Sequence, residues 1–184
     1  MSSGSLNVRE IQQSDITLII DYWLNSDSKY LANMGADISK VPDRLLWTQM
    51  LEEQLQQDYP IKKSYCLIWE VDGKPIGHSN VNKIVFGQEA YMHLHIWYDE
   101  YRNKGLGVQF IKMGLPWFFK NLQLLKIYCE PYALNNAPNK TVEKAGFKLV
   151  KEYITTPGSL NFEQPVKLWE ISAAGVTQSK ARFT

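Results

Sequence analysis

Two histidines occupy one apolar segment that leads directly into a basic turn containing two glycines. His93 and His95 stand two residues apart within residues 90–98. Alternate side chains of an extended segment share a face, so the two imidazoles should lie side by side on one face of a strand. An imidazole with an ordinary pKa changes protonation near neutral pH, which suits a general base. Both histidines are therefore candidates for proton transfer, and packing inside a sheet is the open alternative.

The turn that follows reads Arg-Asn-Lys-Gly-Leu-Gly over residues 102–107. Glycines allow backbone N–H groups to converge where a helix begins, and the positive end of the helix dipole favours a phosphate. We expect this turn to bind a diphosphate. The phosphate loop of nucleotide triphosphatases is excluded, because no glycine-lysine-serine or glycine-lysine-threonine run occurs. A dinucleotide fingerprint needs a third glycine where Phe110 stands, although Glu130 could imitate its ribose-binding acid. A dinucleotide-dependent oxidoreductase therefore stays open as an alternative.

The 184 residues suffice for one globular domain, 1–184, in which residues 175–184 are expected to form a flexible tail. The apolar periodicity predicts the order β-α-α-β-β-β-α-β-α-β-β, a mixed sheet with helices, in the α/β (α+β) class. Residues 25–40 are expected to form a loop, and Pro116 to kink or end its helix. The helix after Pro42 is expected to bury Leu45, Leu46, Met50 and Leu55. The predicted strands span residues 6–11, 64–71, 74–86, 90–98, 124–129, 148–155 and 166–171.

Composition narrows the function classes. The formal net charge of +1 gives no general case for nucleic acid, and no run of 18 apolar residues argues for a membrane span. Cys66 and Cys129 lie in apolar, strand-like segments, which favours a reducing, cytoplasmic setting. Acids exceed bases by seven to three over residues 21–58, whereas bases exceed acids by nine to two over residues 102–151. One half of the chain therefore suits a cationic ligand and the other half suits an anion.

A second motif supports a specific family. Residues 135–147 read Asn-Asn-Ala-Pro-Asn-Lys-Thr-Val-Glu-Lys-Ala-Gly-Phe. The Arg-x-x-Gly-x-Gly turn precedes this segment, and the predicted elements follow the order found in one family. On these features the whole sequence resembles the GNAT acetyltransferase superfamily. The resemblance implies an acyl-CoA N-acyltransferase fold, acetyl-CoA as co-substrate, and direct transfer in a ternary complex. It places the CoA diphosphate on backbone amides of the turn and the pantetheine arm along the preceding strand. It assigns coenzyme binding to Trp97, Tyr98, Arg102, Asn103, Lys104, Gly105, Leu106, Gly107, Val108, Asn135 and Lys144.

The same resemblance suggests catalytic residues. His93 matches the position of a strand histidine in serotonin N-acetyltransferases, and its surrounding string is similar to siderophore-type hydroxylysine acetyltransferases, so we expect His93 to act as base through water. Tyr132 could protonate the CoA thiolate, and Glu130, where some aminoglycoside acetyltransferases carry an acid, could orient or deprotonate the amine. Alternatively, Tyr132 caps its strand and Glu130 faces solvent. Val142 is a departure, because many relatives place a tyrosine general acid there.

The expected function is acetylation of a primary amine of a small, cationic molecule, with Trp23, Tyr30 and Trp47 as candidate walls of its site. Two alternatives stay open: a catalytically inactive acyl-CoA-binding module, and an acetyltransferase of protein N-terminal amines. No metal is expected, because His93 and His95 lack a clear third ligand. His78 is expected to be structural. We expect a monomer or a homodimer.

Overall fold

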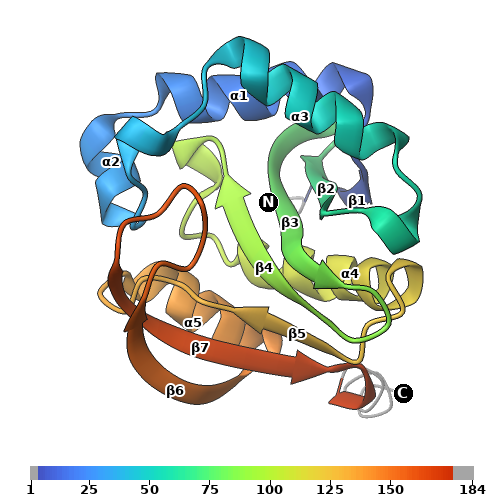
Figure 1. The fold of residues 1–184 in the computed structure, drawn as a ribbon, viewed down its shortest axis with the longest axis vertical. Coiled ribbons are helices and arrows are strands. Elements are labelled where there is room, and N and C mark those ends of the chain that lie inside the picture. The colour runs from blue at the N-terminus through green and yellow to red at the C-terminus, as the bar shows by residue number, and fades with distance from the viewer. Residues whose placement is uncertain (1–3, 176–184) are drawn as a thin grey trace.

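The computed structural model describes residues 4–175 and consists of a seven-stranded sheet with helices on both faces (Figure 1). The strand order is β1-β2-β3-β4-β5-β7-β6. Residues 176–184 of the predicted tail lie outside the described residues. The strands are β1 Leu6–Glu10, β2 Ser64–Val71, β3 Lys74–Val85, β4 Glu89–Ile96, β5 Lys126–Cys129, β6 Lys148–Thr155 and β7 Gln164–Ser172. The α-helices are α1 Ile16–Asn25, α2 Ser28–Asn33, α3 Arg44–Gln56, α4 Leu106–Asn121 and α5 Asn136–Ala145.

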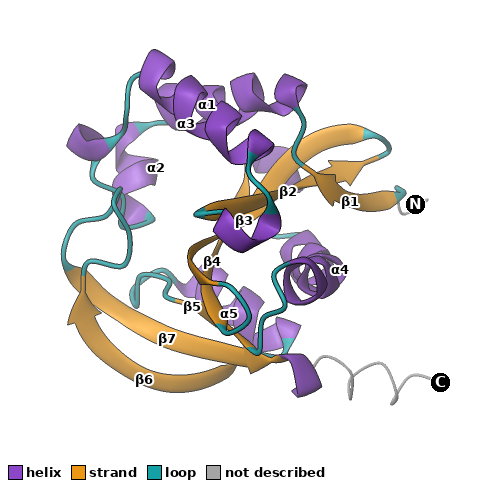
Figure 2. Cartoon of the chain, turned by 45° about the vertical axis from the view of Figure 1, so that its right-hand side comes forward, coloured by secondary structure: helices purple, strands orange, loops and turns teal. Residues whose placement is uncertain are grey.

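All neighbouring strands run antiparallel except β4 and β5, which pair in parallel. That pairing covers only Glu89 to Tyr91 of β4, opposite Lys126 to Tyr128 of β5. Beyond these residues the two strands diverge (Figure 2). The predicted α/β class with a mixed sheet is confirmed, and past Tyr91 the carboxyl end of β4 no longer pairs with β5.

Helix α2 was not expected, and the prediction of a loop over residues 25–40 is wrong for Ser28–Asn33. The side chain of Asp27 accepts hydrogen bonds from the backbone N–H groups of Lys29 and Tyr30. This N-cap starts the helix, and burial of Leu31 anchors it to the core. The polar composition of residues 25–40 did not indicate this six-residue helix, which is stabilised by one N-cap and by the burial of one leucine.

The buried face of α3 also differs from the prediction. Leu45, Leu46 and Met50 are exposed, whereas Trp47 is buried and Leu51 packs beside it. The largest apolar side chain of this helix decides which face turns inward, because it removes the most apolar surface from water. Three apolar side chains of α3 are consequently left on the protein surface.

Helix α4 continues through Pro116 to Asn121, so an early end at this proline is wrong. A proline removes one hydrogen bond within a helix. Leu115 and Phe118 on either side of it are almost completely buried, and this packing holds the helix together. The result is a 16-residue helix that begins directly at the glycine turn.

Two hydrophobic cores lie on opposite faces of the sheet. Helices α4 and α5 cover the face that carries Leu67, Trp69 and Met92, and helices α1–α3 cover the face that carries Cys66 and Ile68. The expected alternation along β4 is present, because Met92 enters the first core while the histidines lie on the second face. Helices α1–α3 therefore decide what can reach the histidines.

Candidate active site

The glycine turn lies at the amino end of α4, as the motif predicts. Gly105 has φ +75° and stands at the N-cap, in a left-handed conformation that glycine adopts without strain. A Cβ on Gly107 would lie 3.1 Å from Cγ2 of Thr141, so this glycine also lets α5 approach α4. Asn103 and Lys104 are exposed, and Leu106 and Val108 are half-buried. The first-turn amides of α4 thus have the orientation that anion binding needs.

Arg102 turns back towards the end of β4. Its Nε and Nη2 atoms donate to the carbonyl oxygen of Ile96 at 3.0 and 2.9 Å, and Nη2 also reaches the carbonyl of Trp97 at 3.2 Å. The guanidinium carbon lies 4.2 Å from the centre of the Tyr30 ring on α2. It also pairs with Asp99. Arg102 therefore links the end of β4 to α2.

The other predicted coenzyme residues are spread around this point. The Trp97 ring is buried, and its Nε1–H donates to Nδ1 of His78 at 2.8 Å. Tyr98 is partly buried, with the ammonium of Lys74 at 4.6 Å from its ring centre. Asn135 forms the N-cap of α5, and Lys144 is exposed near the end of that helix. The structure thus groups most of them around the turn and the divergence of β4 and β5.

A cavity of about 400 Å³ lies between α2 and the connection from β5 to α5. Tyr30, Asn33 and Met34 form its wall on α2. The opposite wall comes from the β5–α5 connection, where β5 has already left β4. The residues of that wall are Tyr132, Leu134, Asn135 and Asn136.

The β5–α5 connection is held by Asn139, a residue whose role the sequence did not reveal. Its Nδ2 donates to the carbonyl oxygens of Tyr132 and Asn135 at 3.0 and 2.7 Å. Its Oδ1 accepts from Nε1–H of Trp169 on β7 at 2.9 Å. Because Asn139 is buried and all three bonds are internal, it fixes the cavity wall to the sheet.

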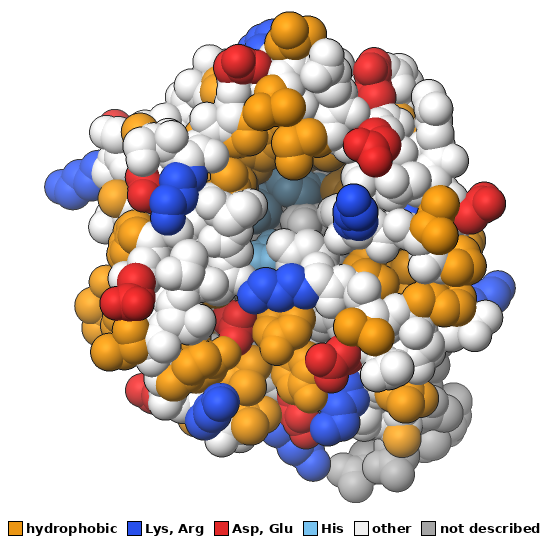
Figure 3. Space-filling view, viewed as in Figure 1, with side chains coloured by type: hydrophobic (Ala, Val, Ile, Leu, Met, Phe, Trp, Pro, Cys, Tyr) orange, Lys and Arg blue, Asp and Glu red, His pale blue; other side chains and the backbone are white. Residues whose placement is uncertain are grey.

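The three histidines lie together on the face covered by α1–α3. His78 pairs with His95 across β3 and β4, and their rings stack at 4.9 Å. His93 lies two pairs further along, opposite Asn80, and His93 and His95 are half-buried. Figure 3 shows a hollow in this face, with histidine side chains at its floor and apolar side chains on the side of α1 and α3.

Hydrogen bonds set the proton positions of two histidines. The Nε2 atom of His93 lies 3.2 Å from Oδ1 of Asn82, and an amide oxygen only accepts, so Nε2 carries the proton and Nδ1 is left as an acceptor. The Nδ1 atom of His78 accepts from Trp97, so its proton is on Nε2. His93 therefore presents a lone pair, as a base must.

The expectation that these imidazoles titrate near neutrality is wrong. Burial, with a smaller effect from the Lys83 ammonium, lowers the pKa of His93 to about 4. Burial also lowers the pKa of His78 to about 3, and that of His95 well below its ordinary value. All three are neutral at physiological pH, because an imidazolium would lose its hydration there.

A chain of hydroxyl groups leads from His95 to the cavity wall. The Tyr22 hydroxyl on α1 lies 3.2 Å from Nδ1 of His95 and 3.1 Å from the Tyr30 hydroxyl. It also contacts Sδ of Met34 at 3.4 Å. Tyr22 is buried, and no sequence pattern singles it out, because it lies within an ordinary apolar helix pattern 73 residues from His95.

Glu130 does not face solvent. Its side chain is 4% exposed, accepts a hydrogen bond from the Tyr153 hydroxyl, and lies 3.8 Å from Nζ of Lys83. Tyr132 borders the cavity, with its ring 6.1 Å from that of Phe162. Among the described residues, His93, Glu130 and Tyr132 share no hydrogen-bond partner. The structure therefore does not place these three side chains in one hydrogen-bonded cluster.

Comparison with known proteins identifies the family. A family model described as an acetyltransferase (GNAT) domain matches residues 5–148. The chain belongs to the GNAT acetyltransferase family. Among curated protein sequences, no significant match is found.

Solved GNAT structures share the fold. A spermidine N-acetyltransferase from Vibrio cholerae, in complex with CoA and spermine, matches with a TM-score of 0.76 at 16% identity, over 94% of this chain and 98% of that one. The aminoglycoside acetyltransferase AAC(6')-Ib with coenzyme A gives 0.73 at 18%, over 96% and 99%. A ribosomal-protein-S5-alanine acetyltransferase from Vibrio fischeri gives 0.73 at 20%, over 91% and 92%. At these identities the likeness establishes the fold.

Some acids on the helical side of this GNAT domain also have structural roles. Asp27, Asp37 and Asp43 accept backbone N–H groups at the starts of α2, a short 3₁₀ helix at Ile38–Lys40, and α3. Asp21 pairs with Arg44. Helix capping therefore accounts for three of the acids in this segment. Trp23 and Trp47 are buried against each other with ring centres 5.6 Å apart, so they are core residues rather than pocket walls.

The loop between β6 and β7 fixes the end of α2. Backbone N–H of Asp37 donates to the carbonyl of Leu160 at 2.7 Å, and Ala36 and Asn161 form a β-bridge. Nδ2 of Asn161 donates to the carbonyl of Gly35 at 2.8 Å. These contacts hold α2, and therefore Tyr30, against the cavity.

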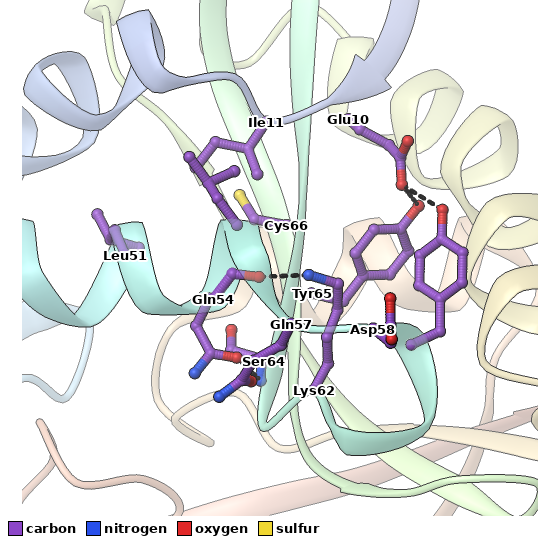
Figure 4. Close-up of a pocket in the computed structure, with 12 residues that line it drawn as sticks. Glu10, Ile11, Leu51, Gln54, Gln57, Asp58, Lys62, Ser64, Tyr65 and Cys66 are labelled. Carbon is purple, nitrogen blue, oxygen red and sulfur yellow. Dashed lines mark hydrogen bonds between the residues drawn. The ribbon is translucent and has the colours of Figure 1, made fainter.

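A second cavity, of about 250 Å³, lies at the far edge of the sheet, between β1, β2 and the end of α3 (Figure 4). The carboxylate of Glu10 in this pocket accepts from the hydroxyls of Tyr59 and Tyr65, both at 2.7 Å. None of the predicted site residues lines this edge pocket.

Residues 4–175 contain neither a candidate metal cluster nor a candidate membrane span. No group of three or more histidine, cysteine, aspartate or glutamate side chains in this part of the chain could hold a metal ion. Within the same residues, no helix has the length and apolar character to cross a bilayer.

Proposed function

We propose that this protein is an acetyl-CoA-dependent N-acetyltransferase that acetylates a primary amine of a small molecule. The observation that carries the proposal is the glycine turn at the start of α4, beside strands that diverge next to a cavity of about 400 Å³. Solved structures of the same fold contain CoA with spermine or CoA alone, which supports the choice of coenzyme and acceptor class.

In this proposal, backbone amides from Asn103 to Val108 bind the diphosphate of CoA. The exposed ammonium groups of Lys104 and Lys144 add charge attraction. The pantetheine arm follows the end of β4 past Trp97 and Tyr98 and reaches the cavity beside Asn135. A backbone-built site of this kind depends mainly on the conformation of its glycines.

The amine acceptor enters through the hollow, and its proton is removed at the hollow floor. Nδ1 of His93 is free to accept that proton through a water molecule, because Asn82 holds the other nitrogen. Glu130 would orient the amine, and the hydrogen bond from Tyr153 together with the ammonium of Lys83 fixes the position of its carboxylate. Two tyrosines that border the cavity, Tyr30 and Tyr132, are candidates for returning a proton to the thiolate. Of these, Tyr132 is the one expected from the sequence.

The transfer is direct, without a covalent enzyme intermediate. Cys129 is buried, and desolvation raises the pKa of its thiol to about 12. Burial likewise raises the pKa of Cys66 well above its ordinary value. Neither thiol forms the thiolate that nucleophilic catalysis requires near neutral pH.

An acetyl-CoA thiol-release assay tests the proposal. The panel contains spermidine, kanamycin, a simple arylalkylamine and an alanine-starting peptide, and it is paired with a melting assay in which acetyl-CoA is titrated. We expect a raised Tm with acetyl-CoA and amine-dependent thiol release with a small molecule. Release only with the peptide would reassign the acceptor to protein N-terminal amines. Coenzyme binding without release for any amine would identify a non-catalytic acyl-CoA-binding module, and no Tm change would end the proposal.

A further inference from the structure

We propose that Tyr30 donates the proton to the departing CoA thiolate, and that Tyr22 and His95 resupply it from the hollow. This inference rests on the proposed acetyltransferase function. It assigns a catalytic role to α2, a helix that the sequence pattern did not predict, and it links the hollow to the cavity through three side chains.

The tyrosine that the family resemblance would make the proton donor is absent from this chain. Val142 stands where many relatives carry a tyrosine, and its side chain is completely buried in the core packed by α4 and α5. The proton must therefore come from another wall of the cavity. Tyr30 and Tyr132 are the two tyrosines among the residues that line it.

The hydrogen bonds distinguish these tyrosines. The Tyr30 hydroxyl lies 3.1 Å from that of Tyr22, which lies 3.2 Å from Nδ1 of His95. For the Tyr132 hydroxyl, residues 4–175 provide no recorded hydrogen-bond partner, and its ring contacts Phe162 instead. Tyr30 thus has a route by which a lost proton can be replaced, whereas Tyr132 would depend on solvent.

Every group of the chain can both donate and accept a proton. As the Tyr30 O–H bond breaks and the S–H bond of CoA forms, Tyr30 takes the proton of Tyr22, and Tyr22 takes the proton on Nδ1 of His95. His93 passes the proton that it has taken from the amine through water to Nε2 of His95, so both imidazoles end neutral. One N–H bond of the amine is broken and one S–H bond is formed, with no net charge left on the protein.

The surroundings favour this neutral relay. Arg102 places its guanidinium 4.2 Å from the centre of the Tyr30 ring, where a cation stabilises negative charge that develops as the proton leaves. Burial raises the pKa of Tyr22 and lowers that of His95, which disfavours a lasting phenolate or imidazolium at either residue. The β6–β7 loop holds the end of α2, so the Tyr30–Tyr22 distance is fixed by the fold.

The experiment compares four phenylalanine variants in the thiol-release assay, with the amine that gives the highest release. Tyr30→Phe and Tyr22→Phe test the relay, Tyr132→Phe tests the competing donor, and Tyr59→Phe in the edge pocket is the matched control. We expect kcat to fall about 100-fold in Tyr30→Phe and at least about tenfold in Tyr22→Phe. The acetyl-CoA-induced rise in Tm should be retained in both, and Tyr59→Phe should keep its turnover.

The solvent isotope effect on kcat separates a relay from a packing role. In mixtures of H₂O and D₂O, the wild-type rate should respond as a transfer of more than one proton, and Tyr22→Phe should respond as a transfer of one. Any of three results would overturn the inference. They are full turnover in Tyr30→Phe or Tyr22→Phe, a wild-type rate that depends linearly on the D₂O fraction, and a loss of turnover in Tyr132→Phe as large as in Tyr30→Phe. Absence of thiol release from the wild type would instead overturn the proposed function and remove the inference with it.

Discussion

Two clusters of tyrosine hydroxyls lie at different places on this protein, and they end in chemically different acceptors. In the hollow, Tyr22 lies between Tyr30 and His95. In the edge pocket, Tyr59 and Tyr65 both donate to one oxygen of Glu10. A carboxylate only accepts, so it fixes both hydroxyl protons, whereas hydroxyl and neutral imidazole groups can exchange the roles of donor and acceptor.

The terminal acceptor, rather than the number of tyrosines, decides whether a hydroxyl cluster can move a proton. Asn121 completes the edge cluster by donating to the hydroxyls of Tyr65 at 2.7 Å and Tyr59 at 3.3 Å. Every proton there has one position, which suits a structural tie between β1, β2 and α4. The hollow cluster has no carboxylate among its recorded partners, and it borders a cavity.

The largest difference between the two regions should appear in the response to coenzyme. We expect Gly107→Asp to weaken acetyl-CoA binding at least about 100-fold, because a carboxylate would repel the diphosphate and its Cβ would press on Thr141. The measurement is the acetyl-CoA-induced change in Tm. Gly107→Ala adds only the Cβ, at 3.1 Å from Thr141 Cγ2, and separates crowding from charge. Glu10→Gln should keep the full response, and an equal loss there would contradict the separation of the regions.

The fold was largely predictable because its strongest signals are local. The glycine turn, the apolar strands and the helix ending at Gly146 depend on short-range conformational preferences, and the structure contains each of them. Helix α2 was missed because one aspartate cap and one buried leucine carry it. The buried face of α3 was misjudged because neighbouring elements, which the sequence does not place, decide whether Trp47 or the leucines turn inward.

Substitution of His93 should have the next largest effect, which is on turnover. We expect His93→Gln to lower kcat about tenfold to 100-fold with acetyl-CoA affinity unchanged, because glutamine can keep a bond to Asn82 but cannot take up a proton. Thiol release measures kcat, and the melting assay measures coenzyme binding. Glu10→Gln is again the control for the edge pocket. Unchanged turnover in His93→Gln would remove this histidine from the mechanism.

The candidate site was only partly predictable. Strand alternation correctly placed His93 and His95 on one face of β4, because that rule needs no tertiary information. The partner of His95 could not be foreseen, because Tyr22 comes from a helix on another part of the chain. The depressed histidine pKa values were equally hidden, since they arise from burial, which for His95 includes packing against Tyr22 and Trp23 of α1.

The pH dependence of stability should differ between the regions. A native His93 pKa of about 4, against 6.5 for an ordinary histidine, means that the unfolded state binds more protons between these values. This contribution to stability is complete above pH 6.5 and is lost as the pH falls towards 4. We expect Tm to fall by several degrees over that range, and to fall less in His93→Gln. Turnover, in contrast, should show no inflection near pH 6.5.

The edge pocket should contribute to the pH dependence of stability at alkaline pH. Hydrogen bonding to Glu10, with burial, raises the pKa of Tyr59 in the native state. Above pH 10 the unfolded tyrosine loses its proton before the native one does, so this contribution to stability is lost as the pH rises. Tyr59→Phe should flatten the alkaline decline in Tm and leave the acid decline unchanged. An altered acid decline in this variant would show that the regions are coupled.

The smallest effect should be the stability cost of Tyr59→Phe at neutral pH. The variant removes a hydroxyl that donates to Glu10 at 2.7 Å, but Tyr65 still donates to the same oxygen, so the carboxylate keeps a partner. We expect a loss of about 1 kcal/mol in the free energy of unfolding, measured by denaturant titration. Tyr65→Phe should cost more, because Tyr65 is buried and its hydroxyl accepts from Asn121 at 2.7 Å, a shorter bond than the 3.3 Å bond from Asn121 to Tyr59. A larger loss in Tyr59→Phe than in Tyr65→Phe would mean that the two hydroxyls do not share Glu10 as the distances indicate.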